Sequence, residues 1–78
     1  MLRQLSTLTA GCSAVIREIG GDETLRRRLL ELGLLPGTVV TVWKRAPFGD
    51  PLQLHLRGFA LTLRASEAEK IRVEVQTP

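Results

Sequence analysis

Leucines alternate with other residues at positions 52, 54 and 56, and after Gly58 the alternation resumes with Phe59, Leu61 and Leu63. A period of two places alternate side chains on one face of a β-strand. A glycine between two such runs predicts a hairpin. The apolar members are Leu52, Leu54, Leu56, Phe59, Leu61 and Leu63. We expect them to face one common core, with His55 on the polar side.

Three further segments carry the same alternation, at residues 12–19, 38–44 and 71–75. In the first, Ala14 and Ile16 are expected to face one way, and Val15 and Arg17 the other. Both faces of residues 38–44 are substantially apolar, which favours a strand covered on both sides over part of its length. Residues 1–10 are expected to form an extended lead-in that tucks its leucines under the core.

One helix is predicted between the first two of these strands. Asp22 is a suitable N-cap, and Gly33 is a suitable residue to end the helix. Between them, three leucines at helical spacing form one apolar stripe: Leu25, Leu29 and Leu32. Pro36-Gly37 then predicts a type II turn into the next strand.

Residues 46–51 contain two prolines and a Gly-Asp pair, so we expect a loop in which Asp50 shapes its own turn. Ser66 and Glu69 have the spacing of a capping box, which predicts one short helical turn near the C-terminal end.

A chain of 78 residues buries only about 60–65% of the surface of its unfolded form, so its core must be economical. Five short strands leave exposed edges unless the sheet curls. We therefore predict a mainly β fold: a small SH3-like five-stranded, partly open β-barrel with one inserted α-helix and a short C-terminal helical turn. Residues 1–78 are expected to form a single domain.

The composition restricts the location of the protein. No apolar run approaches the ~20 residues that a membrane-spanning helix needs, and the first residues lack a signal-peptide hydrophobic region. Cys12 is the only cysteine, and a lone thiol fits a reducing compartment. We expect a cytoplasmic protein in which Cys12 is half-buried at the start of a strand.

Groups that could support catalysis or metal binding are scarce. The chain has one histidine, His55, and one cysteine, and they belong to different predicted strands. Catalysis needs a nucleophile, a base and an orienting group that converge, and metal sites need several ligands. Gly20-Gly21 precedes acidic residues rather than a phosphate-binding lysine. We therefore predict no enzyme activity, no catalytic residue, no resident metal and no cofactor.

Some apolar residues remain that the predicted core does not use. Leu30 lies off the helical stripe, Leu34 and Leu35 stand on a turn, and Phe48 lies in a loop. Three consecutive arginines, residues 26–28, occupy the same helix. If these residues cluster, they form an apolar patch with a cationic rim, which is typical of a protein-docking surface.

The segment from Arg26 to Gly37 resembles the helix-and-turn signature of the FeoA family, and residues 46–51 resemble its second signature. Residues 61–64, 67–68 and 71–74 are similar to its C-terminal part. The resemblance covers residues 5–75 and implies an SH3-like barrel with an inserted helix. It further implies a small cytoplasmic accessory protein of bacterial ferrous iron uptake, with a general association to transition metal ion binding.

The resemblance also implies a partner, the FeoB-type membrane transporter that carries a cytosolic G-protein domain. Contact with the membrane would then occur only through this partner, and a weak homo-oligomer is possible. The signature residues that are not turn formers are the candidates for partner binding: Arg26, Arg27, Leu30, Leu34, Leu35 and Phe48.

Two alternatives stay open at this point. DtxR-type iron-dependent repressors carry a similar domain, so the chain could be a detached regulatory piece. A sequence pI near 10.0 and the arginine run raise a small RNA-binding barrel. The chain has no tyrosine, one tryptophan and two phenylalanines, which is few for the stacking platforms of such barrels, so no nucleic acid is expected.

Overall fold

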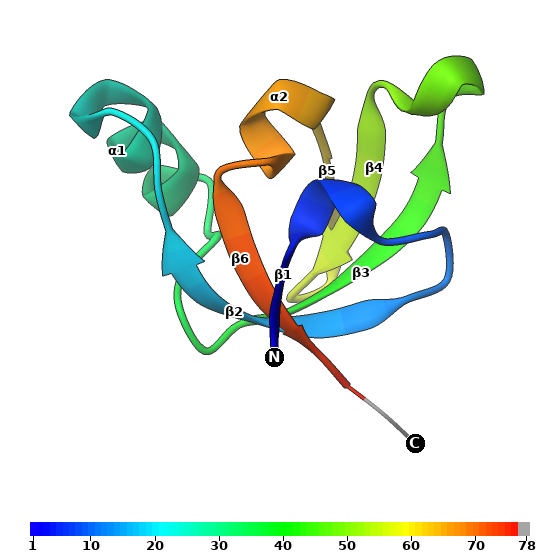
Figure 1. Cartoon of the computed structure of the whole chain (residues 1–78), viewed down its shortest axis with the longest axis horizontal. Coiled ribbons are helices and arrows are strands. Elements are labelled where there is room, and N and C mark those ends of the chain that lie inside the picture. Colours follow the sequence, from blue (N-terminus) through cyan, green and yellow to red (C-terminus); the bar gives the residue numbers. More distant parts are fainter. Residues whose placement is uncertain (77–78) are drawn as a thin grey trace.

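The computed structural model describes residues 1–76, which form a six-stranded antiparallel sheet with short helices on its rim (Figure 1). The strands follow the spatial order β1-β6-β2-β3-β4-β5. They are β1 (Leu2–Gln4), β2 (Ser13–Ile19), β3 (Val39–Arg45), β4 (Leu52–Leu56), β5 (Phe59–Leu63) and β6 (Ile71–Val75). The helices are α1 (Glu23–Glu31) and α2 (Ala65–Ala68), with 3-10 turns η1 (Leu5–Thr7) and η2 (Pro47–Gly49).

The sheet bends into a cup, and α1, α2 and η1 lie along its open rim (Figure 1). The two end strands, β1 and β5, do not pair with each other, so the barrel is partly open, as predicted. The core fills the inside of the cup and draws on most strands and both α-helices. Its larger buried side chains include Leu5, Leu8, Ile16, Leu29, Leu34, Val40, Val42, Leu52, Leu54, Leu63, Ile71 and Val73.

The first residues supply a sixth strand that the alternation did not indicate. β1 pairs with β6 in the register Leu2–Glu74 to Gln4–Arg72. Three residues are too short for a recognisable period of two, and the pairing depends on a strand about 70 residues away. The expected lead-in role is partly confirmed, because Leu5 and Leu8 are buried while Leu2 is exposed.

The β4–β5 hairpin forms as predicted. Leu56 pairs with Phe59, and Arg57 and Gly58 between them have φ angles of 49° and 81°. Two positive φ angles in a two-residue loop are the signature of a type I′ turn. Phe59 differs from the prediction, since it is 45% exposed rather than part of the core. It opens the end strand β5, which has a neighbour on only one side.

The two faces of β3 differ more than the sequence suggested. Val40 and Val42 are buried on the inner face, whereas Val39 and Trp43 on the outer face are 45% and 46% exposed. The prediction that β3 is covered on both sides is therefore wrong. The helices all lie on the rim of the cup, so the described chain leaves the outer face of β3 to solvent (Figure 1).

Helix α1 begins and ends where the sequence predicts. The Asp22 carboxylate accepts a hydrogen bond of 2.8 Å from the Leu25 N–H, and Gly33 reverses the chain with φ = 97°. The leucine stripe is only partly confirmed, because Leu29 is buried and Leu25 is half-buried, but Leu32 is 36% exposed. Leu32 is the C-cap residue, and the reversal after it directs a later residue into the core.

Helix α2 begins two residues earlier than the capping-box prediction. The Arg64 N–H donates to the Glu67 carboxylate at 3.0 Å, so Glu67 rather than Glu69 closes the box. Asp50 accepts a hydrogen bond of 2.9 Å from the Ala65 N–H. Asp50 therefore joins the η2 loop to the start of α2, a long-range contact that its local sequence did not reveal.

Within residues 1–76, no helix has the length and apolar character needed to cross a membrane.

Candidate functional site

A cleft of about 410 Å³ separates α1 from the end of β2. Its lining residues are Arg17, Glu18, Ile19, Arg26, Leu30 and Pro36. Leu30 and Ile19 are half-buried, and Ile19 packs against the core. The cleft therefore combines an apolar floor with charged walls, and it brings together two of the predicted site residues, Arg26 and Leu30. We call it the α1 cleft.

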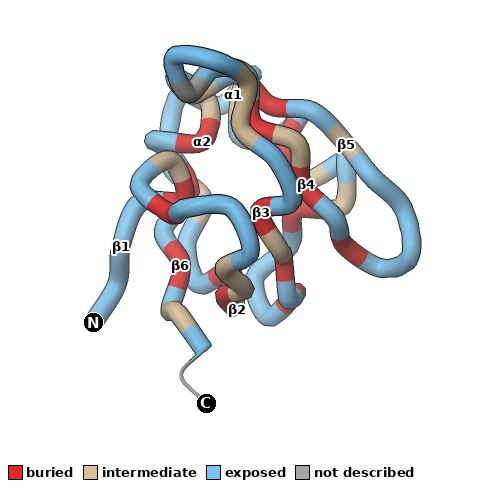
Figure 2. The backbone as a smooth tube through the Cα atoms, turned by 90° about the vertical axis from the view of Figure 1, so that its right-hand side faces the viewer, coloured by how far each residue is buried: buried red, intermediate tan, exposed pale blue. Residues whose placement is uncertain are grey.

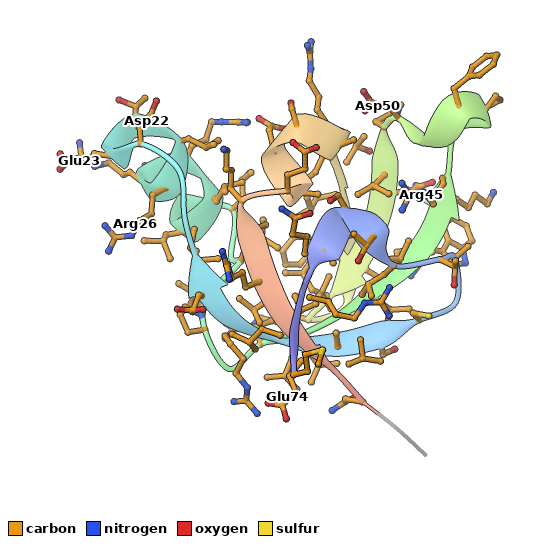
Figure 3. All side chains as sticks on the ribbon, viewed as in Figure 1. Asp22, Glu23, Arg26, Arg45, Asp50 and Glu74 are labelled. Carbon is orange, nitrogen blue, oxygen red and sulfur yellow. The ribbon has the colours of Figure 1, made fainter. Side chains whose placement is uncertain are left out.

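The three consecutive arginines have different environments. Arg27 forms an ion pair of 3.1 Å with Glu23 one helical turn earlier. Arg28 pairs with Glu67 and so connects α1 to α2. The Arg26 side chain makes no hydrogen bond or ion pair with any residue between 1 and 76. Arg26 is thus the member of the run whose charge remains available at the cleft, and Figure 3 shows it beside α1 and β2.

Leu34 was expected on the docking surface, but it is fully buried. The Leu34 N–H donates to the Leu29 carbonyl at 3.1 Å, and the Gly33 N–H donates to the Leu30 carbonyl at 3.0 Å. These two bonds define a Schellman motif, in which the residue after the glycine packs back onto the last helical turn. Leu34 therefore fastens the end of α1 to the core and offers no side chain to a partner.

The remaining two predicted contact residues do not extend the cleft into a larger patch. Leu35 is 36% exposed on the turn after α1, whereas Phe48 is fully exposed on η2. In Figure 1, whose horizontal direction is the longest axis of the molecule, α1 and η2 lie at opposite ends. The prediction of a single patch that includes Leu34 and Phe48 is wrong. Leu34 is buried, and the sheet lies between α1 and the η2 turn that carries Phe48.

A second exposed apolar region lies on the outer face of β3, β4 and β5, and the sequence reasoning missed it. The Trp43 and His55 rings stack with centroids 4.5 Å apart, and the Lys44 ammonium lies 4.3 Å from the Trp43 ring. Beside them, an open hollow of about 330 Å³ is lined by His55, Gly58, Phe59 and Ala60. The sequence signal for this region is the run of apolar residues on the outer face of residues 38–44. That pattern predicts a strand covered by other elements on both faces, and so it does not indicate an exposed surface.

The described residues offer little to a metal ion or a reacting substrate. Among residues 1–76, no three His, Cys, Asp or Glu side chains converge. Cys12 is half-buried just before β2 and contacts the Thr9 hydroxyl at 3.4 Å, while His55 lies on β4 in contact with Trp43.

Residues 3–75 match the FeoA domain family. The chain is 38% identical over 72 residues to the Fe(2+) transport protein A/Fe(2+) transporter FeoB fusion protein of Porphyromonas gingivalis. That alignment covers 92% of this chain but only 8% of the much longer fusion protein.

Two solved structures share both sequence and fold with the chain. The FeoA protein from Chlorobium tepidum is 39% identical, with a TM-score of 0.88 over 96% of this chain and 71% of the other. The zinc-complexed FeoA of Stenotrophomonas maltophilia, described as a prokaryotic SH3 domain protein, is 32% identical, with a TM-score of 0.79 over 95% and 89%. The predicted SH3-like class is thereby confirmed, with six strands in place of five.

A manganese-dependent transcriptional repressor has the same fold at a TM-score of 0.87, with 20% identity. The match covers 96% of this chain and 42% of the repressor. At this identity the likeness concerns the fold alone.

Proposed function

The chain belongs to the FeoA family, and on that premise we propose that it is a cytoplasmic accessory protein of bacterial ferrous iron uptake. We propose further that it regulates or assembles a FeoB-type transporter by docking onto it. The fusion protein of P. gingivalis supports this partner, because its name joins transport protein A and FeoB in a single protein. FeoA is not a known enzyme family, which agrees with a role in binding rather than in catalysis.

The observation that carries the docking proposal is the α1 cleft. Its apolar floor includes Leu30, and the Arg26 guanidinium stands at its edge with no partner among residues 1–76. A buried apolar contact beside an unpaired guanidinium is a common anchor arrangement at protein interfaces, where arginine is enriched. We propose that an acidic, partly apolar surface of the transporter fills this cleft.

Adjacent arginines provide a matched test of this site. Arg26→Glu and Arg27→Glu make the same charge change on the same helix, but only Arg26 lines the cleft. We expect Arg26→Glu to weaken binding at least about tenfold, or about 1.4 kcal/mol, because it places like charges together at the interface. We expect Arg27→Glu to have an effect several-fold smaller.

Binding is measured by titrating the protein with the purified transporter in detergent and, separately, with its soluble G-protein domain. Leu30→Ser tests the apolar floor, and the circular dichroism spectrum of each variant checks that it folds. Equal losses for Arg26→Glu and Arg27→Glu would remove the α1 cleft as the docking site. Absence of binding to either form of the transporter would remove the proposed partner.

A further inference from the structure

The outer edge of β5 presents unpaired backbone groups. In a hairpin with a two-residue loop, the residues that flank the loop exchange hydrogen bonds, and the next pair does not. Leu56 and Phe59 flank this loop, so the N–H and C=O groups of Ala60 and Thr62 point away from β4. Neither residue makes a backbone hydrogen bond outside the β4 ladder within the part of the chain described. Both are exposed.

The position of β5 leaves this edge accessible. β5 ends the sheet, and its only strand partner among residues 1–76 is β4. Figure 2 shows the hairpin half of β5 as an exposed segment at the periphery of the molecule. An extended segment of another chain could therefore add to the sheet here through main-chain hydrogen bonds.

Two hollows reach β5, at positions two residues apart. Ala60 lines the hollow shared with His55, Gly58 and Phe59. Thr62 lines a second hollow of about 200 Å³, whose other residues are Lys44, Arg45, Ala46, Pro51 and Gln53. Side chains two positions apart on a strand point to the same face. An added strand would therefore direct one side chain toward each hollow.

The chemistry of the two hollows differs. The first is largely apolar and is lined by the small Ala60 residue together with His55, its cross-strand partner on β4. The second is lined by Lys44, whose ammonium lies 4.3 Å from the centroid of the neighbouring Trp43 ring, while the Arg45 guanidinium is engaged with the carbonyls of Ser6 and Leu8. An apolar side chain suits the first hollow, and a carboxylate suits the second.

The charge distribution favours the same kind of ligand. Residues 39–64 hold four basic residues and a single acidic one, Asp50, so this segment alone accounts for the net charge of +3. The other residues balance, with seven basic and seven acidic. The single acidic residue, Asp50, accepts a hydrogen bond from the Ala65 N–H. Two exposed arginines, Arg57 and Arg64, flank the two ends of β5.

We propose that β5 is a second docking element, which binds an extended acidic segment of a partner protein by strand addition. The bound segment carries an apolar residue and an acidic residue two positions apart, one for each hollow. This inference rests on the proposed function for the identity of the partner, the FeoB-type transporter, but it uses a surface separate from the α1 cleft.

The test uses the full chain and overlapping 12-residue peptides that span the cytosolic segments of the transporter. We expect an acidic peptide of the stated pattern to bind and to slow amide hydrogen exchange at Ala60 and Thr62. A peptide with its apolar and acidic residues exchanged is the matched ligand control, and we expect it to bind at least tenfold more weakly.

A matched pair of variants at Ala60 separates strand addition from simple charge attraction, and a charge reversal at Lys44 tests the second hollow. Ala60→Pro removes an N–H that points away from β4 and so breaks no bond of the β4–β5 ladder, whereas Ala60→Val keeps this N–H, so we expect at least a tenfold loss with the first alone. Lys44→Glu is expected to reject the acidic peptide and to accept its Asp/Glu→Lys counterpart. Because amide protection is measured on the unmodified chain, the proposal is tested even if Ala60→Pro does not fold.

Several outcomes would overturn the inference. They are binding without protection of the two amides, unchanged affinity in a folded Ala60→Pro variant, or absence of binding by every acidic peptide. Protection of the same amides by a second copy of the chain, or by a single-stranded oligonucleotide, would assign the edge to another ligand. If the transporter still binds in an Arg26-dependent way, the proposed function survives such a failure.

Discussion

The α1 cleft and the outer face of β3–β5 both expose apolar side chains, but they are built to receive different shapes. The cleft is a compact depression between a helix and a strand, with one unpaired guanidinium at its edge. The face of β3–β5 is an open surface that ends in a free strand edge, and it belongs to the segment, residues 39–64, that carries the excess positive charge. The first suits a protruding side chain, and the second suits an extended segment.

Both regions contain a residue that a β-bulge has displaced from the regular ladder. The β2–β6 register shifts between Ile16 and Glu18, and Arg17 in that gap lines the α1 cleft. The β3–β4 register shifts between Val42 and Lys44, and Trp43 in that gap stacks on His55. Bulges redirect side chains and are frequent near functional sites. The comparison indicates that each surface depends on a local irregularity of the sheet.

The largest expected loss of stability is at Leu34, which holds the end of α1 on the core. Leu34→Ala removes a fully buried side chain, so we expect a loss of about 2–5 kcal/mol in the free energy of unfolding. Leu35→Ala, at the exposed neighbour, is expected to change it by less than about 0.5 kcal/mol. Urea denaturation measures both values, and similar losses at the two positions would contradict the assignment of Leu34 to the core.

A smaller effect is expected at the turn that ends α1. Gly33 has φ = 97°, so Gly33→Ala is expected to cost about 1–2 kcal/mol through backbone strain. The new Cβ would lie 3.5 Å from the Phe59 ring, an ordinary contact, so steric overlap adds little. Gly33→Asn is the matched control, because asparagine tolerates this conformation better. Thermal unfolding distinguishes the two, and equal destabilisation would refute the strain explanation.

The Arg28–Glu67 ion pair, which connects α1 to α2, is expected to contribute still less to the free energy of unfolding. A double-mutant cycle with Arg28→Ala and Glu67→Ala should give a coupling energy of about 0.5–1 kcal/mol, because Arg28 is half-exposed. The Arg27–Glu23 pair is more exposed, and we expect about 0.3–0.5 kcal/mol for it. Both coupling energies are measured by denaturation at low salt. A larger coupling for Arg27–Glu23 than for Arg28–Glu67 would show that Arg28 does not fix α1 on the barrel.

The smallest expected effect is a change in the fluorescence of Trp43, which shows whether the two docking regions bind independently. Trp43 is the only tryptophan, and it is 46% exposed beside His55 on the outer face. We expect a peptide bound at β5 to shift the fluorescence emission of Trp43 to shorter wavelength, because it partly removes the ring from water. The shift is expected to persist in Arg26→Glu. Loss of the shift in that variant would show that the two regions are one site.

Much of the fold was predictable because its signals are local. The alternation of residues 52–63 predicted the hairpin, and Asp22 and Gly33 predicted the ends of α1. The candidate site was predictable only in part, since Arg26 and Leu30 meet in the α1 cleft, whereas Phe48 lies elsewhere. Gly33 was recognised as the end of a helix, and the accompanying Schellman geometry could have placed Leu34 in the core.

The sequence by itself determined which segments become strands and helices, because backbone geometry and side-chain period act over a few residues. Only the tertiary structure decided which apolar side chains stay exposed. Val39, Trp43 and Phe59 have the sequence character of core residues, yet they remain accessible. Their exposure depends on which strand ends the sheet and which face the helices cover, and segments distant in the chain set both of these.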